Sequence, residues 1–219
     1  MPGLRARHMN RLTRFSPIPT GWLSSRVATI CAKYVNLYLC RYQGGFIAFD
    51  TGFSVSLAAG GLQSLSIPAE TVTHVFLTHS DYDHVGGLGA FPQAKVYLAA
   101  AEESVASGRI QRAPLYRNKL QQAVEYFDFP FALNLGELTI RGIHAPGHTP
   151  GSTVYQVNDE MLFVGDAILL QNGKPIRFFP LFNMDSRQHR QSLAMLSGML
   201  VGQQIFTAHA GICLDLPAN

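Results

Sequence analysis

Seven residues of two chemical types stand out because each follows a segment rich in apolar and β-branched residues. Imidazole nitrogens and carboxylate oxygens are common protein ligands of divalent transition metals. A catalytic metal site collects such ligands from several loops and leaves a position for water or substrate. We therefore expect one metal centre built from four histidines and three aspartates: His79, Asp81, Asp83, His84, His148, Asp166 and His209.

The first four of these residues are close together in the sequence. In extended chain, side chains two residues apart face the same side, so His79 and Asp81 are predicted to face one ion. The adjacent Asp83 and His84 can turn toward a second ion. The pair Gly86-Gly87 follows and lets the backbone pass close to the site.

The elements that must position these residues alternate between strands and helices in the first half of the chain and form hairpin-like strand pairs in the second. Residues 109–130 interrupt this order as an inserted helical or loop segment that could form a wall over the site. Residues 169–184 are predicted to be a long loop. The predicted strands are 27–32, 35–42, 46–49, 72–78, 95–98, 137–143, 152–157, 161–164 and 204–207, and the predicted helices are 55–65, 86–91, 99–106 and 186–200.

The motifs around the seven residues resemble those of a known family. Residues 78–87, Thr-His-Ser-Asp-Tyr-Asp-His-Val-Gly-Gly, are similar to the T-H-x-H-x-D-H-x-G-G signature of metallo-β-lactamase-fold hydrolases, a superfamily that includes glyoxalase II and lactonases. Four further motifs match in the expected places: Asp50-Thr51-Gly52, the loop 143–152 around His148, the strand end 163–167 around Asp166, and 207–211 around His209.

This resemblance implies an α/β fold, the four-layer αββα sandwich of two mixed β-sheets with helices on the outer faces. It implies a single domain over residues 21–219, preceded by an N-terminal extension, 1–20. It also implies a ligand set: His79, Asp81 and His148 for one ion; Asp83, His84 and His209 for a second; and Asp166 as the bridge. A hydroxide shared by the two ions would attack a carbonyl, and Asp83, as the catalytic residue, could handle a proton.

Asp81 departs from the family pattern, which has histidine at this place. With Asp81, Asp83 and Asp166 the site holds three carboxylates where the family usually has two. The family favours two zinc ions, and a harder, less electrophilic site shifts the preference toward iron or manganese. The flavodiiron branch of the family similarly has a carboxylate here and uses iron for redox chemistry.

Several other residues are assigned supporting roles. Asp50 is expected to support the metal loop, and His144 to orient the loop of His148. His74 and His189 are expected to be packing residues. A substrate pocket is predicted to use Tyr82 and three aromatic residues of the later loop, Phe178, Phe179 and Phe182.

The composition limits the partners. A net charge of +3 spread over the early part of the chain does not make a nucleic-acid surface. No apolar run approaches the roughly 18 residues that a membrane span needs. The three cysteines lie in apolar segments and are expected to be buried reduced thiols of a cytoplasmic protein. The expected partner is a small-molecule substrate, and the oligomeric state, including a homodimer, is left open.

Three functions remain open at this stage. The first is a metal-dependent hydrolase that acts on an ester, lactone or thioester carbonyl. The second is an iron-dependent oxidoreductase, because His79, His148 and Asp166 also match the iron triad of the persulfide dioxygenase branch. The third is a metal-binding protein without catalysis.

Overall fold

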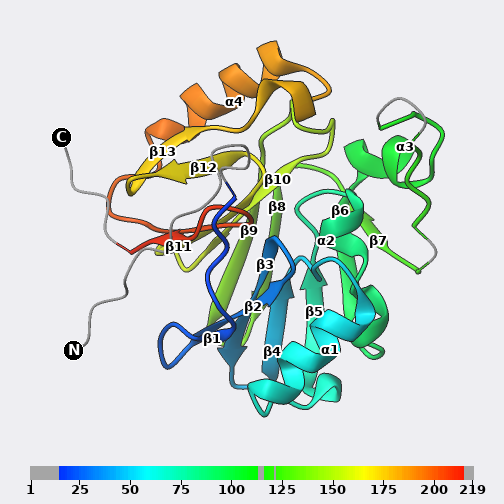
Figure 1. The fold of residues 1–219 in the computed structure, drawn as a ribbon, viewed down its shortest axis with the longest axis vertical. Coiled ribbons are helices and arrows are strands. Elements are labelled where there is room, and N and C mark those ends of the chain that lie inside the picture. Colours follow the sequence, from blue (N-terminus) through cyan, green and yellow to red (C-terminus); the bar gives the residue numbers. More distant parts are fainter. Residues whose placement is uncertain (1–14, 113–115, 121, 215–219) are drawn as a thin grey trace.

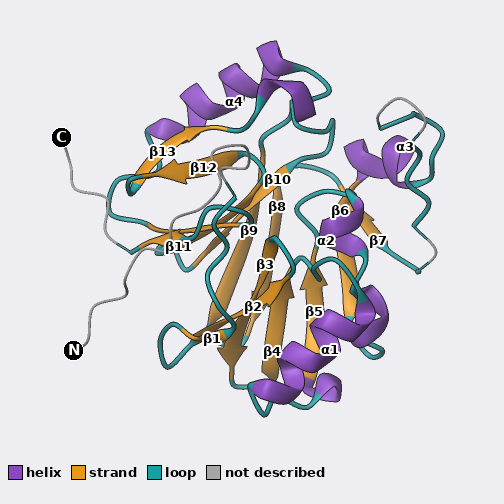
Figure 2. Cartoon of the chain, in the orientation of Figure 1, coloured by secondary structure: helices purple, strands orange, loops and turns teal. Residues whose placement is uncertain are grey.

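The computed structural model describes residues 15–112, 116–120 and 122–214, and these form two β-sheets that pack face to face (Figure 1). Helix α1 (Val55–Ser64) lies against the first sheet, and α4 (Ser186–Ser197) lies on the opposite side of the molecule near the second (Figures 1 and 2). The predicted four-layer αββα arrangement is therefore confirmed.

The first sheet contains seven strands in chain order. Its first four strands pair antiparallel, and β4 to β7 pair parallel. Helix α1, which connects β4 to β5, begins at Ser54, whose hydroxyl accepts a hydrogen bond from the Leu57 amide. The strands are β1 (Gly21–Trp22), β2 (Val27–Ala32), β3 (Val35–Tyr42), β4 (Gly45–Phe49), β5 (Val72–Phe76), β6 (Lys95–Ala99) and β7 (Glu125–Phe127).

The second sheet contains six strands in the order β15-β14-β11-β10-β9-β8. All its pairs are antiparallel except β11 with β14, which run parallel because the connection between them passes through α4. The strands are β8 (Phe131–Leu135), β9 (Leu138–His144), β10 (Thr153–Val157), β11 (Met161–Gly165), β14 (Gln204–Thr207) and β15 (Ile212–Cys213).

The space between the two sheets is filled largely by aromatic side chains. The Phe49 and Phe163 rings come from different sheets and stack 3.8 Å apart. Phe76, Tyr155 and Phe206 surround them and are buried as well. Truncation of one such ring to alanine typically costs about 3–5 kcal/mol, so this layer fixes the position of one sheet on the other.

The prediction of a long loop over residues 169–184 is wrong for its first half, which forms two strands. Strands β12 (Ile168–Gln171) and β13 (Lys174–Arg177) pair antiparallel there. Asn172 and Gly173 form the turn between them, both with positive φ, as a two-residue hairpin turn requires. The 3₁₀ turn η4 (Pro180–Phe182) then leads to α4.

Two other expectations need correction. The insert 109–130 includes strand β7, which extends the first sheet. Cys40 is buried as expected, whereas Cys31 and Cys213 are only half-buried.

The remaining helical elements are short, and they lie in the connections between strands of the first sheet. They are η1 (Ala69–Thr71), α2 (Tyr82–Val85), η2 (Leu88–Ala90), η3 (Ala100–Glu102) and α3 (Glu103–Ala106). Within the described part of the chain, every helix is too short or too polar to cross a membrane.

Candidate metal centre

The structure brings all seven predicted ligands to one edge of the paired sheets. The loop that carries the first four follows β5, Asp166 follows β11, and His209 lies just beyond β14. His148 lies in the turn that joins β9 to β10. Because β4 runs parallel to β5 and β11 runs parallel to β14, the ends of these strands meet at the same edge.

The donor atoms form two groups. In the first group, Asp81 Oδ2 lies 3.5 Å from His79 Nε2 and 3.1 Å from His148 Nε2. In the second group, Asp83 Oδ2 lies 3.9 Å from His84 Nε2 and 3.5 Å from His209 Nε2. Donors bound at about 2.0–2.1 Å around a tetrahedral ion lie roughly 3.3–3.4 Å from one another, so both spacings suit a divalent metal.

Asp166 stands between the two groups with one oxygen toward each. Its Oδ2 lies 3.3 Å from His148 Nε2 in the first group. Its Oδ1 lies 3.2 Å from His209 Nε2 and 3.4 Å from His84 Nε2 in the second. This is the placement that a bridging carboxylate requires.

Hydrogen bonds at Nδ1 fix the tautomer of the four histidines. His84 Nδ1 donates to Asp50 Oδ2 at 2.8 Å, and His209 Nδ1 donates to the Tyr34 carbonyl at 2.8 Å. His148 Nδ1 donates to Asn183 Oδ1 at 3.1 Å. His79 Nδ1 donates to the hydroxyl of Thr78, because that hydroxyl itself donates to Asp50. Each Nε2 therefore points toward the centre, where the neutral ring can offer its lone pair to a metal.

Buried atoms without partners provide a direct test of whether a cation fits. Among the described residues, His79 Nε2, His84 Nε2 and Asp166 Oδ1 are buried and have no hydrogen-bond partner. Such an atom costs about 1–3 kcal/mol when it stays unsatisfied. A divalent ion would satisfy all three, so the residues present fit a metal.

Asp50 supports this arrangement from behind. It has a φ of 58°, an unusual conformation for a residue other than glycine, and it is buried. The conformation lets its carboxylate accept from His84 Nδ1, from the Thr78 amide at 2.7 Å and from the Thr78 hydroxyl. Asp50 thus positions both the start and the end of the ligand loop.

Glu102 links two ligand loops that belong to different sheets. Its buried carboxylate accepts from the Ser80 amide at 3.0 Å and the Ser80 hydroxyl at 2.7 Å. Its other oxygen accepts from the Gly151 amide at 2.8 Å. The predicted close approach at Gly86-Gly87 is also present: a Cβ on Gly87 would lie 2.0 Å from the Thr51 carbonyl.

Charge and burial together set the protonation of the centre. Burial alone raises the pKa of Asp166, but His209, His84 and His148 outweigh it and hold that pKa well below its usual range. Burial alone lowers the pKa of His84, but Asp50, Asp166 and Asp83 outweigh it and raise the pKa well above its usual value. The carboxylate is therefore ionised and ready to bind a cation.

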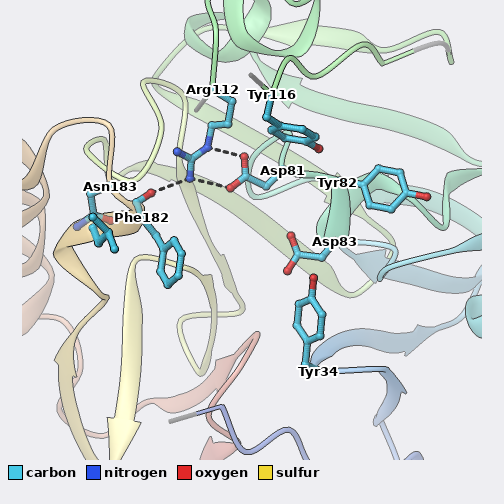
Figure 3. Close-up of a pocket in the computed structure, with 9 residues that line it drawn as sticks. Tyr34, Asp81, Tyr82, Asp83, Arg112, Tyr116, Phe182 and Asn183 are labelled. Carbon is cyan, nitrogen blue, oxygen red and sulfur yellow. Dashed lines mark hydrogen bonds and ion pairs between the residues drawn. The ribbon is translucent and has the colours of Figure 1, made fainter. Parts of the chain in front are cut away.

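Arg112 is a member of this centre that the sequence analysis did not identify. Its Nε and Nη2 donate to the two oxygens of Asp81 at 2.6 and 2.7 Å (Figure 3). Nη2 also lies 3.0 Å from His148 Nε2 and 2.8 Å from the Phe182 carbonyl, so its two hydrogens are shared among three acceptors. The guanidinium thus pairs with the one ligand that departs from the family pattern.

Comparison with known proteins agrees with this architecture. A family model described as the metallo-beta-lactamase superfamily matches residues 32–205. The chain belongs to the metallo-beta-lactamase superfamily. Its members are mostly hydrolases and bind divalent metals.

Individual relatives are distant. The chain is 27% identical over 187 residues to a hydroxyacylglutathione hydrolase from Rhodospirillum rubrum, covering 84% of this chain and 64% of the relative. It is 26% identical over 178 residues to a hydroxyacylglutathione hydrolase from Aeromonas hydrophila subsp. hydrophila, covering 79% and 60%. The chain thus spans less than two thirds of the length of the curated relatives it matches.

Solved structures show the same fold. A metallo-beta-lactamase family protein from Thermus thermophilus aligns with a TM-score of 0.68 at 22% identity. The alignment covers 89% of this chain and 76% of that one. At this identity the likeness supports the superfamily fold and leaves substrate and metal undetermined.

A cavity of about 550 Å³ opens beside the metal centre of this superfamily member. Three tyrosines, Tyr34, Tyr82 and Tyr116, line it together with Asp81, Asp83 and Arg112 (Figure 3). A second cavity of about 240 Å³ reaches His148, Asp166 and His209. The centre is therefore accessible from a pocket with aromatic walls.

The predicted supporting residues lie in different places. Tyr82 lines the larger cavity, Phe182 lines both, and Phe178 lines the smaller one and contacts the His148 ring edge-on at 4.9 Å. Phe179 packs behind Phe178 instead and does not line either cavity. His144 Nε2 donates to the Pro150 carbonyl of the His148 loop at 2.9 Å, and its ring stacks on Phe129.

Phe15 also lies at the centre, although it falls within the predicted N-terminal extension. Its ring stacks on His209 with centroids 4.3 Å apart. The neighbouring Ser16 amide donates to the His209 carbonyl at 2.7 Å. Residues before the first strand thus cover one ligand.

Proposed function

We propose that this protein is a metal-dependent hydrolase that cleaves an ester, thioester or lactone carbonyl. The observation that carries the proposal is the set of four histidine Nε2 atoms and three carboxylates that converge on one place, of which Asp81 and Asp83 line the open aromatic pocket. A divalent ion bound there supplies a water with a pKa near neutrality and an electrophile for a carbonyl oxygen. The distant likeness to hydroxyacylglutathione hydrolases supports an acyl substrate.

The chain's own residues would perform the remaining steps. Asp83 lines the cavity and is partly exposed, so it can accept a proton from the attacking water. The hydroxyl of Tyr34 points toward Asp83 (Figure 3). Burial and then the charge of Asp83 raise the pKa of Tyr34, so its hydroxyl stays protonated and can donate to a substrate oxygen.

The rim of the pocket indicates what kind of acyl group would fit. Leu181 is 91% exposed and lies beside Phe182 and the three tyrosines. An exposed apolar side chain at a cavity mouth favours binding of an apolar or aromatic substrate portion. We infer a substrate with an apolar acyl or alcohol part next to the scissile carbonyl.

The test is a hydrolysis assay with separately zinc-, iron(II)- and manganese-loaded protein on thioesters, lactones, esters, phosphodiesters and β-lactams. We expect turnover of a carbonyl substrate, and Asp166→Ala to lower it on the order of a hundredfold or more, since metal ions contribute several kcal/mol. The exposed carboxylate variant Asp128→Asn is the matched control. Absence of turnover across the whole panel would overturn the proposal. Oxygen uptake by the iron-loaded protein would overturn it in favour of the oxidoreductase.

A further inference from the structure

Arg112 engages the first group of donors far more closely than a wall residue of the pocket would. Its side chain is only 8% exposed, and its bonds run to Asp81, His148 and the Phe182 carbonyl. Two of its partners are the carboxylate and one imidazole that would hold an ion in the first group (Figure 3). The guanidinium therefore lies against the first metal position.

The bond to His148 matters most because an imidazole nitrogen has a single lone pair. His148 Nδ1 donates to Asn183, so Nε2 is the acceptor, and it lies 3.0 Å from Arg112 Nη2 and 3.1 Å from Asp81 Oδ2. His148 cannot accept this bond and ligate an ion with the same lone pair. Both oxygens of Asp81 also accept from Arg112 in a bidentate pair, which leaves each of them a further lone pair, so the competition at Asp81 is one of charge.

The charge of Arg112 acts in the same direction. A guanidinium stays charged at all ordinary pH values, so it is a permanent cation beside the place where a second cation would bind. It also supplies the positive charge that the additional carboxylate, Asp81, requires in this partly buried position. An ion is therefore not needed to neutralise Asp81.

The second group has no such competitor. Among the described residues, His84 Nε2 and Asp166 Oδ1 have no hydrogen-bond partner; His79 Nε2 of the first group has none either, so the competition by Arg112 is at Asp81 and His148. The hydrogen bonds of Arg112 reach neither Asp83, His84 nor His209 within that part of the chain. An ion that binds these donors has no side chain to displace in the described part of the chain.

We propose that Arg112 competes with metal for the first group, so that the protein binds one divalent ion tightly, through Asp83, His84, Asp166 and His209. A second ion binds only by displacing Arg112 from Asp81 and His148. This inference rests on the proposed metal centre and does not depend on which substrate is cleaved.

The experiment measures metal stoichiometry and affinity without any substrate. Metal-free wild type, Arg112→Ala and Arg112→Met are titrated with Zn²⁺ against a chromophoric chelator, and bound metal is counted by elemental analysis after desalting. The matched control is Arg117→Ala, an exposed arginine of the same segment whose Nη1 donates to the Gly108 carbonyl. Arg112→Met keeps the apolar volume of the side chain in case the alanine variant does not fold.

We expect one tight ion in wild type and in the control. In the Arg112 variants the affinity for the second ion should rise at least about tenfold, the lower end of what outer partners of ligands contribute. Anomalous scattering from wild type with one equivalent of Zn²⁺ should place the ion in the second group.

Three results would overturn the inference: two ions of comparable affinity in wild type, unchanged second-ion affinity in the Arg112 variants, or a first ion located in the first group. Each differs from failure of the proposed function, which would appear as correct metal binding without hydrolysis of the substrate panel.

Discussion

The two halves of the ligand cluster contain the same residue types but have different neighbours. The second group, Asp83, His84 and His209, is supported from behind by Asp50 and a backbone carbonyl, which leave its inward atoms available. In the first group, an arginine donates directly to Asp81 and His148. Ligand type and spacing alone thus do not determine which half binds metal; the residues around the ligands do.

The largest expected effect comes from removing the support of the second group. Asp50→Ala leaves the buried Nδ1 of His84 and the Thr78 amide without their acceptor. We expect a loss of about 3–5 kcal/mol in the free energy of unfolding, as for other broken buried pairs. Affinity for the tight ion should fall about 10–100-fold.

Denaturant titration and chelator competition measure these two effects. Asp159→Ala, at an exposed carboxylate, is the control. If Asp50→Ala weakens a second ion but leaves the tight one unchanged, the assignment of the tight ion to the second group is wrong.

Solution pH should distinguish the two groups. Burial alone lowers the pKa of His209, but the charge of Asp166 outweighs burial and raises that pKa. The pKa of His84 is raised in the same way by its three neighbouring carboxylates, Asp50, Asp166 and Asp83. In metal-free protein, these protonated rings stabilise the fold fully below the unfolded pKa of about 6.5. That contribution is lost as the pH rises through the higher folded pKa.

Metal affinity should change in the opposite direction, because an ion displaces the same protons. It should weaken as the pH falls, by up to about tenfold per pH unit for each proton displaced. The carboxyl of Asp81 in the first group does not titrate in the pH range of these histidines. Burial alone raises its pKa, but His148 and His79 outweigh burial and hold that pKa well below its usual range. Thermal unfolding with and without Zn²⁺ from about pH 6 to 9, a range that brackets the usual histidine pKa, tests this, and a pH-independent affinity would contradict it.

The smallest effect is the coupling within the first group. Asp81→Ala leaves Arg112 without its carboxylate, so the double variant with Arg112→Ala should be more stable than the sum of the two single effects predicts. We expect a coupling free energy of about 1–3 kcal/mol from chemical denaturation of all four proteins. The exposed pair Arg141 and Asp159 gives the reference cycle, with an expected coupling below about 1 kcal/mol. Equal couplings would mean that Arg112 forms an ordinary surface pair.

The sequence was sufficient to predict that the seven candidate ligands come together, because they follow recognisable strands. The β-branched run before His79 and the apolar run before Asp166 predict strand ends, and strand ends of parallel pairs meet at one edge. The hairpin β12–β13 had a usable signal as well, the dipeptide Asn172-Gly173, which is typical of a two-residue turn. The aromatic content of residues 169–184 obscured it.

Arg112 had no comparable signal. It belongs to an insert without periodic pattern, and its partner Asp81 is 31 residues away in the sequence. Asn183 and Phe15 reach the centre through the packing of loops and of the N-terminal segment, which local patterns do not encode. The additional carboxylate at position 81 was the one hint that a cation other than a metal belonged nearby. The cytoplasmic location, the domain boundary at residue 20 and the oligomeric state stay predictions.

The position of Glu102 has an evolutionary consequence. The Glu102 carboxylate accepts hydrogen bonds from both the Ser80 loop and the Gly151 loop, and Glu102 precedes the insert that carries Arg112. Changes of length or composition in that insert would therefore leave the Glu102 link between the two loops in place, even where the contacts of Arg112 with both loops are lost. Surface segments of this kind diverge readily between relatives. The insert is thus the part through which relatives of this chain could alter metal number and substrate choice while Glu102 still links the two ligand loops.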